Sequence, residues 1–181
     1  MNQEFRLLFP LDVFYQQEGL SLPPVSCVEG EAVPEPYRRL LVGNHDMTPT
    51  LEAFHGGSVG LAVLRRQVTG ETLVREVVLS HIATGKPVEF GAIVIHLSVF
   101  PSEAQEAILS GSYPLGTILA MYDIRHLSCP QAFLAVQSDA TINQALHLST
   151  SHLLYGRRNI LLTPDNQIFA DIVEILPPVS P

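Results

Sequence analysis

The sequence TLVREVVL at Thr72–Leu79 decides the fold of this chain. It is β-branched and apolar and contains no Gly or Pro, which predicts a β-strand. Because side chains alternate between the two faces of a strand, Arg75 lies on a face that is otherwise apolar. The other residues of that face are Leu73, Val77 and Leu79. A buried guanidinium needs an anion or a full set of acceptors, so we expect its partner to be a protein carboxylate or the carboxylate of a ligand.

The size and composition of the chain predict one compact domain. Its 181 residues are 46% hydrophobic and only 15% charged, which is typical of a globule with a proper core. We therefore expect a single domain over residues 1–181, in which residues 1–40 form a proline-rich lead-in of loops with a turn or two of helix.

Charge and cysteine content narrow the range of partners and the compartment. The formal net charge is −8 and the basic residues form no run, which argues against nucleic acid and anionic membranes as partners. A small anionic ligand is compatible with this charge, since one or two buried arginines can bind a carboxylate. Cys27 and Cys129 belong to no C-x-x-C motif, and no apolar run is long enough to span a bilayer, so we expect a cytoplasmic protein.

The order of the predicted elements indicates an α+β fold with one antiparallel sheet. Short turns separate three consecutive strands, a capped helix follows, and two more strands close the chain. These strands are Ser58–Val68, Thr72–Ser80, Val88–Leu97, Leu153–Thr163 and Gln167–Leu176, and the helix has a capping box at Ser102 and Gln105. The weaker signals between them indicate a helix at Thr117–Tyr122, a break at Pro130, a strand at Phe133–Gln137 and a helix or hairpin arm at Asp139–Leu148.

A helix start precedes the first of these strands. Thr48 offers a hydroxyl at a cap position, Pro49 suits the first helical position, and the N–H groups of a helix N-terminus suit an anion. A loop that simply enters a surface helix explains the same residues. His45, Asp46 and His55 lie close in sequence, but their spacing matches no usual metal motif, so we expect no metal site.

The last predicted strand carries a second isolated charge. Glu174 shares its face with apolar residues only, and Asp171 does the same on the opposite face. Burial raises the pKa of a carboxyl that has no nearby cation, so Glu174 can be protonated near neutral pH and can transfer a proton. The alternative is that Glu174 pairs with Arg75 or Arg157, and strand parity alone does not decide between these interpretations.

Five short segments follow one another in a characteristic order. They are Asp46-Met47-Thr48, Arg75–Leu79, Pro114-Leu115-Gly116, Tyr155–Arg158 and Glu174–Pro177. In this order they resemble the chorismate pyruvate-lyase family, over roughly residues 41 to 178, and Asn44–Glu52 is similar to a divergent branch of it. The chain contains no P-loop and no G-x-G-x-x-G motif.

The resemblance implies an antiparallel sheet of about six strands with helical flaps over a buried ligand pocket. It implies a carbon–oxygen lyase that converts chorismate to 4-hydroxybenzoate and pyruvate without metal or organic cofactor. In such an enzyme Arg75 and the backbone N–H of Met47 would hold the ring carboxylate. Leu115 would add a backbone contact, and Glu174 would face the 4-hydroxyl.

Within that interpretation, we expect Glu174 to move a proton while Arg75 fixes the ring. Arg157 or Arg158 faces the enolpyruvyl carboxylate, but not both, because adjacent strand residues point to opposite faces. Asp171 replaces Glu174 if the register of the last strand shifts by a residue or two. The expected partners are chorismate and 4-hydroxybenzoate, with no nucleic acid and no membrane insertion.

The main alternative is a non-catalytic binding module of the same fold for an aromatic or small carboxylic acid. The ligand-binding domains of one large group of bacterial transcription regulators resemble this fold. The first 40 residues, however, show no helix-turn-helix or basic segment and are too short for a winged helix. Two further alternatives are a catalytically silent member of the family and a lyase that acts on another chorismate-like compound.

Overall fold

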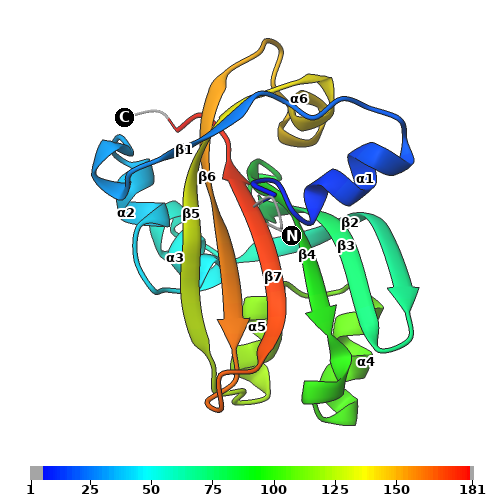
Figure 1. Ribbon diagram of the computed structural model, residues 1–181. Coiled ribbons are helices and arrows are strands. Elements are labelled where there is room, and N and C mark those ends of the chain that lie inside the picture. The colour runs from blue at the N-terminus through cyan, green and yellow to red at the C-terminus, as the bar shows by residue number, and fades with distance from the viewer. Residues whose placement is uncertain (1–5, 180–181) are drawn as a thin grey trace.

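The computed structural model describes residues 6–179, which form one antiparallel sheet of seven strands with helices on both faces (Figure 1). The strand order is β1-β5-β6-β7-β4-β3-β2. The strands are β1 (Val25–Val28), β2 (Val59–Thr69), β3 (Thr72–His81), β4 (Pro87–His96), β5 (Leu127–Gln137), β6 (Leu153–Leu162) and β7 (Ile168–Leu176). The described helices are α1 (Leu11–Gln17), α2 (Tyr37–Leu41), α3 (Met47–His55), α4 (Ser102–Ser110), α5 (Leu115–Met121) and α6 (Ala140–Leu146), with short 3₁₀ turns at Gly30–Ala32 and Leu97–Val99. The α+β class and the single antiparallel sheet are therefore confirmed.

The expected number of about six strands is one too few, because the proline-rich lead-in supplies β1. This strand has only four residues and pairs antiparallel with β5, with Val25 opposite Val136. Its residues show no alternation between buried and exposed positions, and Pro23 and Pro24 precede it. The pattern that marks a half-buried strand is absent, so only the contact with β5 makes this segment a strand.

Strand β5 runs through Pro130, where the sequence predicts a break. The pairing of β5 with β6 shifts register between Pro130 and Ala132. Proline has no N–H for the ladder, and a bulge is one of the few places at which a strand tolerates it. The predicted break is therefore wrong, and the predicted strand at Phe133–Gln137 is the second half of a longer one.

The register of the central strands places Arg75 near the middle of the sheet. Arg75 of β3 lies opposite Ile93 of β4, Ile93 lies opposite Ile172 of β7, and Ile172 lies opposite Asn159 of β6. Residues in such a row point to the same face, so Arg75 and Asn159 share a face across four strands.

The helices cover the two faces of the sheet in two groups (Figure 1). Helices α1 and α6 pack against one face through a cluster that includes Phe14, Phe90 and Ile142. The face of Arg75 is covered by α4 and α5 through one apolar cluster and by α2 and α3 through another. None of the helices in the described part of the chain is long and apolar enough to cross a membrane.

The helix starts differ in detail from those predicted. Helix α3 begins at Met47 with Asp46 at its N-cap, so Thr48 is its second residue and not its cap. Pro101 occupies the N-cap of α4, and no side chain caps that helix, so the predicted capping box is absent. The short helix expected after Gly116 is confirmed as α5, and the segment after β5 is helix α6 and not a hairpin arm.

Candidate ligand-binding site

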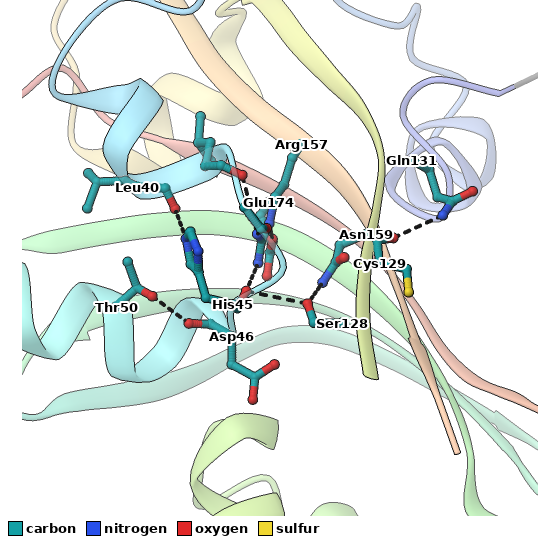
Figure 2. Close-up of polar contacts among 12 residues, drawn as sticks. Leu40, His45, Asp46, Thr50, Ser128, Cys129, Gln131, Arg157, Asn159 and Glu174 are labelled. Atoms are coloured by element: carbon teal, nitrogen blue, oxygen red, sulfur yellow. Dashed lines mark hydrogen bonds and ion pairs between the residues drawn. The ribbon is translucent and has the colours of Figure 1, made fainter. Parts of the chain in front are cut away.

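A buried arginine fixes the start of α3 above the sheet. Arg157 of β6 is fully buried, and its Nε donates to Oε2 of Glu174 at 2.5 Å (Figure 2). Its remaining N–H groups donate at 2.9–3.3 Å to the carbonyl oxygens of Leu41, the last residue of α2, and of Gly43 and His45 in the segment between α2 and α3. This clamp ties the segment to the sheet and so sets where Met47 and the rest of α3 begin.

The same segment is held by a second set of contacts. Ser128 Oγ donates to the carbonyl of His45 at 3.4 Å, and Asn159 Nδ2 donates to Ser128 Oγ at 2.9 Å (Figure 2). Gly43 has a φ of +147°, and a Cβ at this position would lie 2.6 Å from Nδ1 of His45. Only glycine fits this turn, so the placement of α3 depends on long-range contacts and on one glycine.

A cavity of about 60 Å³ lies between the sheet and helices α3 and α5. Its lining includes Arg75, Met47, Leu115 and Glu174, which are predicted site residues, and most of the remaining wall is aliphatic. Arg157 does not line the cavity but contacts Glu174 beside it. A cavity of about 150 Å³ holds benzene, so this one suits a small molecule, and a larger ligand requires α3 and α5 to move apart.

Arg75 is a buried cation without a counter-ion in the described residues. It is 2% exposed, its Nη1 donates to the carbonyl of Ile108 in the last turn of α4 at 3.3 Å, and its Nε has no partner within residues 6–179. Burial lowers the pKa of Arg75 to about 10, so the side chain is still charged at neutral pH. A helix C-terminus attracts a cation without neutralising it. The cavity therefore contains an uncompensated positive charge.

The N-terminus of α3 adds a second electropositive group. The N–H groups of Met47 and Thr48 have no acceptor within the helix, and they carry the positive end of its dipole. Both residues line the cavity together with Arg75. Gly116 of α5 is in close contact with Thr48, since a Cβ at Gly116 would lie 2.7 Å from Thr48 Oγ1. An anion in the cavity can thus reach donors from β3 and from α3.

The two candidate acids of β7 are both paired. Glu174 is on the cavity face and binds Arg157, whereas Asp171 is on the opposite face and accepts two bonds from Arg158 Nη2 at 2.6 and 2.7 Å. Of the interpretations left open, the structure shows the ion pair between Glu174 and Arg157. Asp171 and Arg158 are not among the lining residues of the cavity.

Glu89 of β4 and Asn159 of β6 line the cavity but were not identified from the sequence. They are 5% and 1% exposed, and Glu89 Oε2 and Asn159 Oδ1 have no partner in the described part of the chain. Each lies on the inner face of its strand, Glu89 among apolar residues and Asn159 two residues after Arg157. The parity argument that identified Arg75 identifies both of them as well.

An ion pair lies at the rim of the cavity. Nε2 of His126 is 2.7 Å from Oδ2 of Asp46, and its Nδ1 is 2.8 Å from the carbonyl oxygen of Ile124. The hydrogen bond with Asp46 raises the pKa of His126 above its ordinary value. Since Asp46 precedes α3 and His126 follows α5, this pair connects the two helices that flank the cavity.

The arrangement is suited to binding a small anion. It offers one desolvated guanidinium, the free N–H groups of a helix start and an aliphatic wall. Within residues 6–179, no group of three or more His, Cys, Asp and Glu side chains is placed to hold a metal ion. Three of the five segments noted in the sequence have a structural role, because Arg157 and Glu174 position α3 and Gly116 allows α5 to contact it.

Comparison with known proteins supports the fold and no closer relationship. No family model and no curated protein matches the chain. Among solved structures, the effector domain of PhnF from Mycobacterium smegmatis has a TM-score of 0.56 at 14% identity, covering 75% of this chain and 90% of that one. A second PhnF structure from M. smegmatis has a TM-score of 0.55 at 12% identity, covering 92% of each chain. The possible transcriptional regulator YydK from Bacillus subtilis has a TM-score of 0.54 at 11% identity, covering 92% of this chain and 91% of that one.

These comparisons correct the family and function expected from the sequence. These three structures are described as an effector domain, as PhnF and as a possible transcriptional regulator, and none as a chorismate lyase, so the resemblance to the chorismate pyruvate-lyase family is wrong. The conversion of chorismate to 4-hydroxybenzoate is withdrawn with it. The expectation that chorismate is a partner and nucleic acid is not is also withdrawn, because YydK is described as a possible transcriptional regulator. That the chain is an enzyme, a carbon–oxygen lyase, stays a prediction.

Proposed function

We propose that this protein is a binding domain for a small carboxylic acid. The observation that carries the proposal is Arg75, a buried cation whose Nε has no partner in the described residues and which lines a cavity at the start of α3. An unpaired buried charge costs several kcal/mol, of the order of 3–5 where its partner has been removed, and a ligand carboxylate supplies that partner. A planar carboxylate also matches the fork of a guanidinium.

The shared fold supports binding as the principal role. The PhnF domain with this fold is described as an effector domain. In this protein the two helices beside the cavity contribute to its wall, α3 through Met47 and α5 through Leu115. A ligand that fills the cavity therefore touches the elements that would have to move to signal its arrival.

We also infer a cytoplasmic location. Cys27 is exposed and Cys129 is partly exposed, and both are free cysteines. Free thiols in accessible positions are typical of a reducing compartment. This inference supports a role in sensing or binding a metabolite within the cell.

The test measures thermal stability in the presence of short and aromatic monocarboxylates, including acetate, propionate, lactate, pyruvate and benzoate. A ligand that binds only the folded state stabilises it by about 2.7 kcal/mol at a concentration 100 times its Kd. At least one acid should raise Tm in a concentration-dependent manner, and Arg75→Leu should remove the effect. Equal responses of the native protein and Arg75→Leu would contradict the proposal.

A further inference from the structure

Two carboxyl groups and one arginine lie side by side beside the cavity. Glu174 of β7 is opposite Gly91 of β4, and Glu89 is two residues before Gly91 on the same strand. Diagonal neighbours of this kind lie about 7–8 Å apart and on one face of a sheet. Both acids are almost fully buried, at 5% exposure for Glu89 and 4% for Glu174, and both line the cavity.

Arg157 can neutralise only one of these acids. Its Nε is bound to Glu174, and its other contacts are with backbone carbonyls of the segment before α3. Arg158 is on the opposite face of the sheet and binds Asp171. Glu89 is thus left with an oxygen, Oε2, that has no hydrogen-bond partner in the described residues.

The electrostatic surroundings of Glu89 favour its neutral form. Burial and the nearby charge of Glu174 raise the pKa of Glu89 well above its ordinary value, and Arg157 offsets only part of this. A protonated carboxyl is a hydrogen-bond donor, unlike a carboxylate. Ketosteroid isomerase shows the principle, since it keeps an aspartic acid neutral at pH 7 so that the acid can donate a hydrogen bond.

We propose that Glu89 is the specificity-determining residue of the cavity, a neutral carboxylic acid that donates a hydrogen bond to an uncharged oxygen of the bound monoanion. The proposal rests on the proposed function, which places the carboxylate of the ligand at Arg75. The ligand class is then a short oxo or hydroxy acid. Its charged end faces Arg75 and its carbonyl or hydroxyl oxygen faces Glu89.

The distance between the two residues sets the size of such a ligand. Arg75 lies opposite Ile93, and Glu89 is four residues before Ile93 on β4. The Cα atoms of Arg75 and Glu89 are therefore about 14 Å apart at a rise of about 3.3 Å per residue and a strand spacing of about 4.8 Å. Both side chains line the same cavity, and its volume of about 60 Å³ limits a ligand that contacts both to a small molecule.

The charge balance of the cavity excludes two other ligand classes. A dicarboxylate needs a second free cation, and Arg75 is the only arginine among the described residues that line the cavity. A ligand with an ammonium group needs Glu89 to lose its proton beside Glu174, which is unfavourable in a buried site. A neutral oxygen requires no change of charge. Asn159 Oδ1, which also has no partner in the described part of the chain, can accept the proton of a ligand hydroxyl.

The first experiment detects the proposed proton directly. Difference infrared spectroscopy of the unliganded protein at neutral pH should show the C=O band of a protonated carboxyl, and Glu89→Gln should remove it. Glu76→Gln is the matched control, because Glu76 is equally buried but is bound to Arg65 at 2.6 Å. The band should persist in that variant. Absence of a band that depends on Glu89 would overturn the proposal.

The second experiment compares five three-carbon acids as ligands: propionate, lactate, pyruvate, malonate and β-alanine. Pyruvate or lactate should bind roughly tenfold more tightly than propionate, as expected for one hydrogen bond in a buried site. Malonate and β-alanine should bind more weakly than pyruvate and lactate. Glu89→Gln keeps a donor and should keep the preference, whereas Glu89→Leu should abolish it.

The outcomes distinguish a failure of carboxylate binding at Arg75 from a failure of the role of Glu89. If none of the acids binds, the proposed function fails and the ligand-recognition role of Glu89 fails with it. If the acids bind in a manner that depends on Arg75, but Glu89→Leu leaves the preference unchanged, only the role of Glu89 is overturned. Tight binding of malonate or β-alanine likewise overturns the proposed state of Glu89 and leaves the carboxylate site at Arg75 intact.

Discussion

Arg75 and Arg157 are buried on the same face of the sheet, yet only Arg157 is paired with a carboxylate in the described residues. Arg157 is bound to Glu174 at 2.5 Å and to three backbone carbonyls. Arg75 contacts one carbonyl at 3.3 Å and leaves its Nε without a partner in the described part of the chain. Arg157 stabilises the fold, whereas Arg75 lowers the stability of the unliganded protein, and a ligand would offset that loss.

Replacing Arg75 with leucine should leave the unliganded protein at least as stable as the native one. The change removes a desolvated charge that has no counter-ion, and the expected gain is about 1–3 kcal/mol in the free energy of unfolding. Urea denaturation without added acid measures it. A loss of several kcal/mol would show that Arg75 belongs to the scaffold.

The same replacement at Arg157 should have the opposite effect. Arg157→Leu leaves Glu174 buried without its cation and three carbonyls without their donor, so we expect a loss of about 3–5 kcal/mol. The double variant Arg157→Leu/Glu174→Leu should recover part of that loss, because it removes the unpaired carboxylate as well. If the double variant is no more stable than the single one, the ion pair does not account for the effect.

The ion pair between His126 and Asp46 should make stability depend on pH in one direction. Contact with Asp46 raises the pKa of His126 in the folded state, so its contribution is fully present below the unfolded pKa and is lost as pH rises through the folded pKa. The stability difference between the native protein and His126→Ala should therefore be largest near pH 5, at about 1 kcal/mol, and should shrink above neutrality. Denaturation across this pH range measures the difference.

A matched substitution identifies the cause of this pH dependence. Asp46→Asn keeps the shape of the side chain but removes its charge, so it should lower the pKa of His126, as followed by NMR. An unchanged pKa in Asp46→Asn would show that the contact of His126 with the Ile124 carbonyl dominates instead.

Adding one methyl group between α3 and α5 should disturb the cavity. In Gly116→Ala the new Cβ would lie 2.7 Å from Oγ1 and 2.8 Å from Cβ of Thr48, so the two helices must separate. Overpacking of this kind costs about 1–3 kcal/mol and should weaken acid binding. Gly60→Ala is the control, since its Cβ meets Ile82 at an ordinary 3.4 Å. Equal effects of the two changes on binding would argue against a role for the contact between α3 and α5.

The alternation of residues along the strands predicts most of the fold and the residues on the inner face of the site. β3, β4, β6 and β7 have apolar sequences without internal proline, and parity alone puts Arg75 and Glu174 on inward-facing positions. This reasoning does not identify β1 or the first half of β5, because a four-residue strand without a buried residue and a proline-containing bulge show no alternating pattern. Tertiary pairing decides both segments.

The partners of buried charges are the part that the sequence leaves open. Strand parity leaves two arginines as possible ion-pair partners of Glu174. That Arg157 is the partner depends on the register of the sheet and on the loop before α3, whose conformation depends on Gly43 and His45. Short shared segments also misled the functional interpretation, because residues that hold this fold together need not carry a shared reaction.

The central claim is that Arg75 binds the carboxylate of a ligand, and the Nε–H signal of Arg75 in a ¹⁵N NMR spectrum tests it most directly. The signal is assigned by its absence in Arg75→Leu, and that of Arg157 serves as an internal reference. Saturating pyruvate or lactate should shift the Arg75 signal strongly and leave the Arg157 signal in place. An Arg75 signal that no monocarboxylate moves would contradict the account.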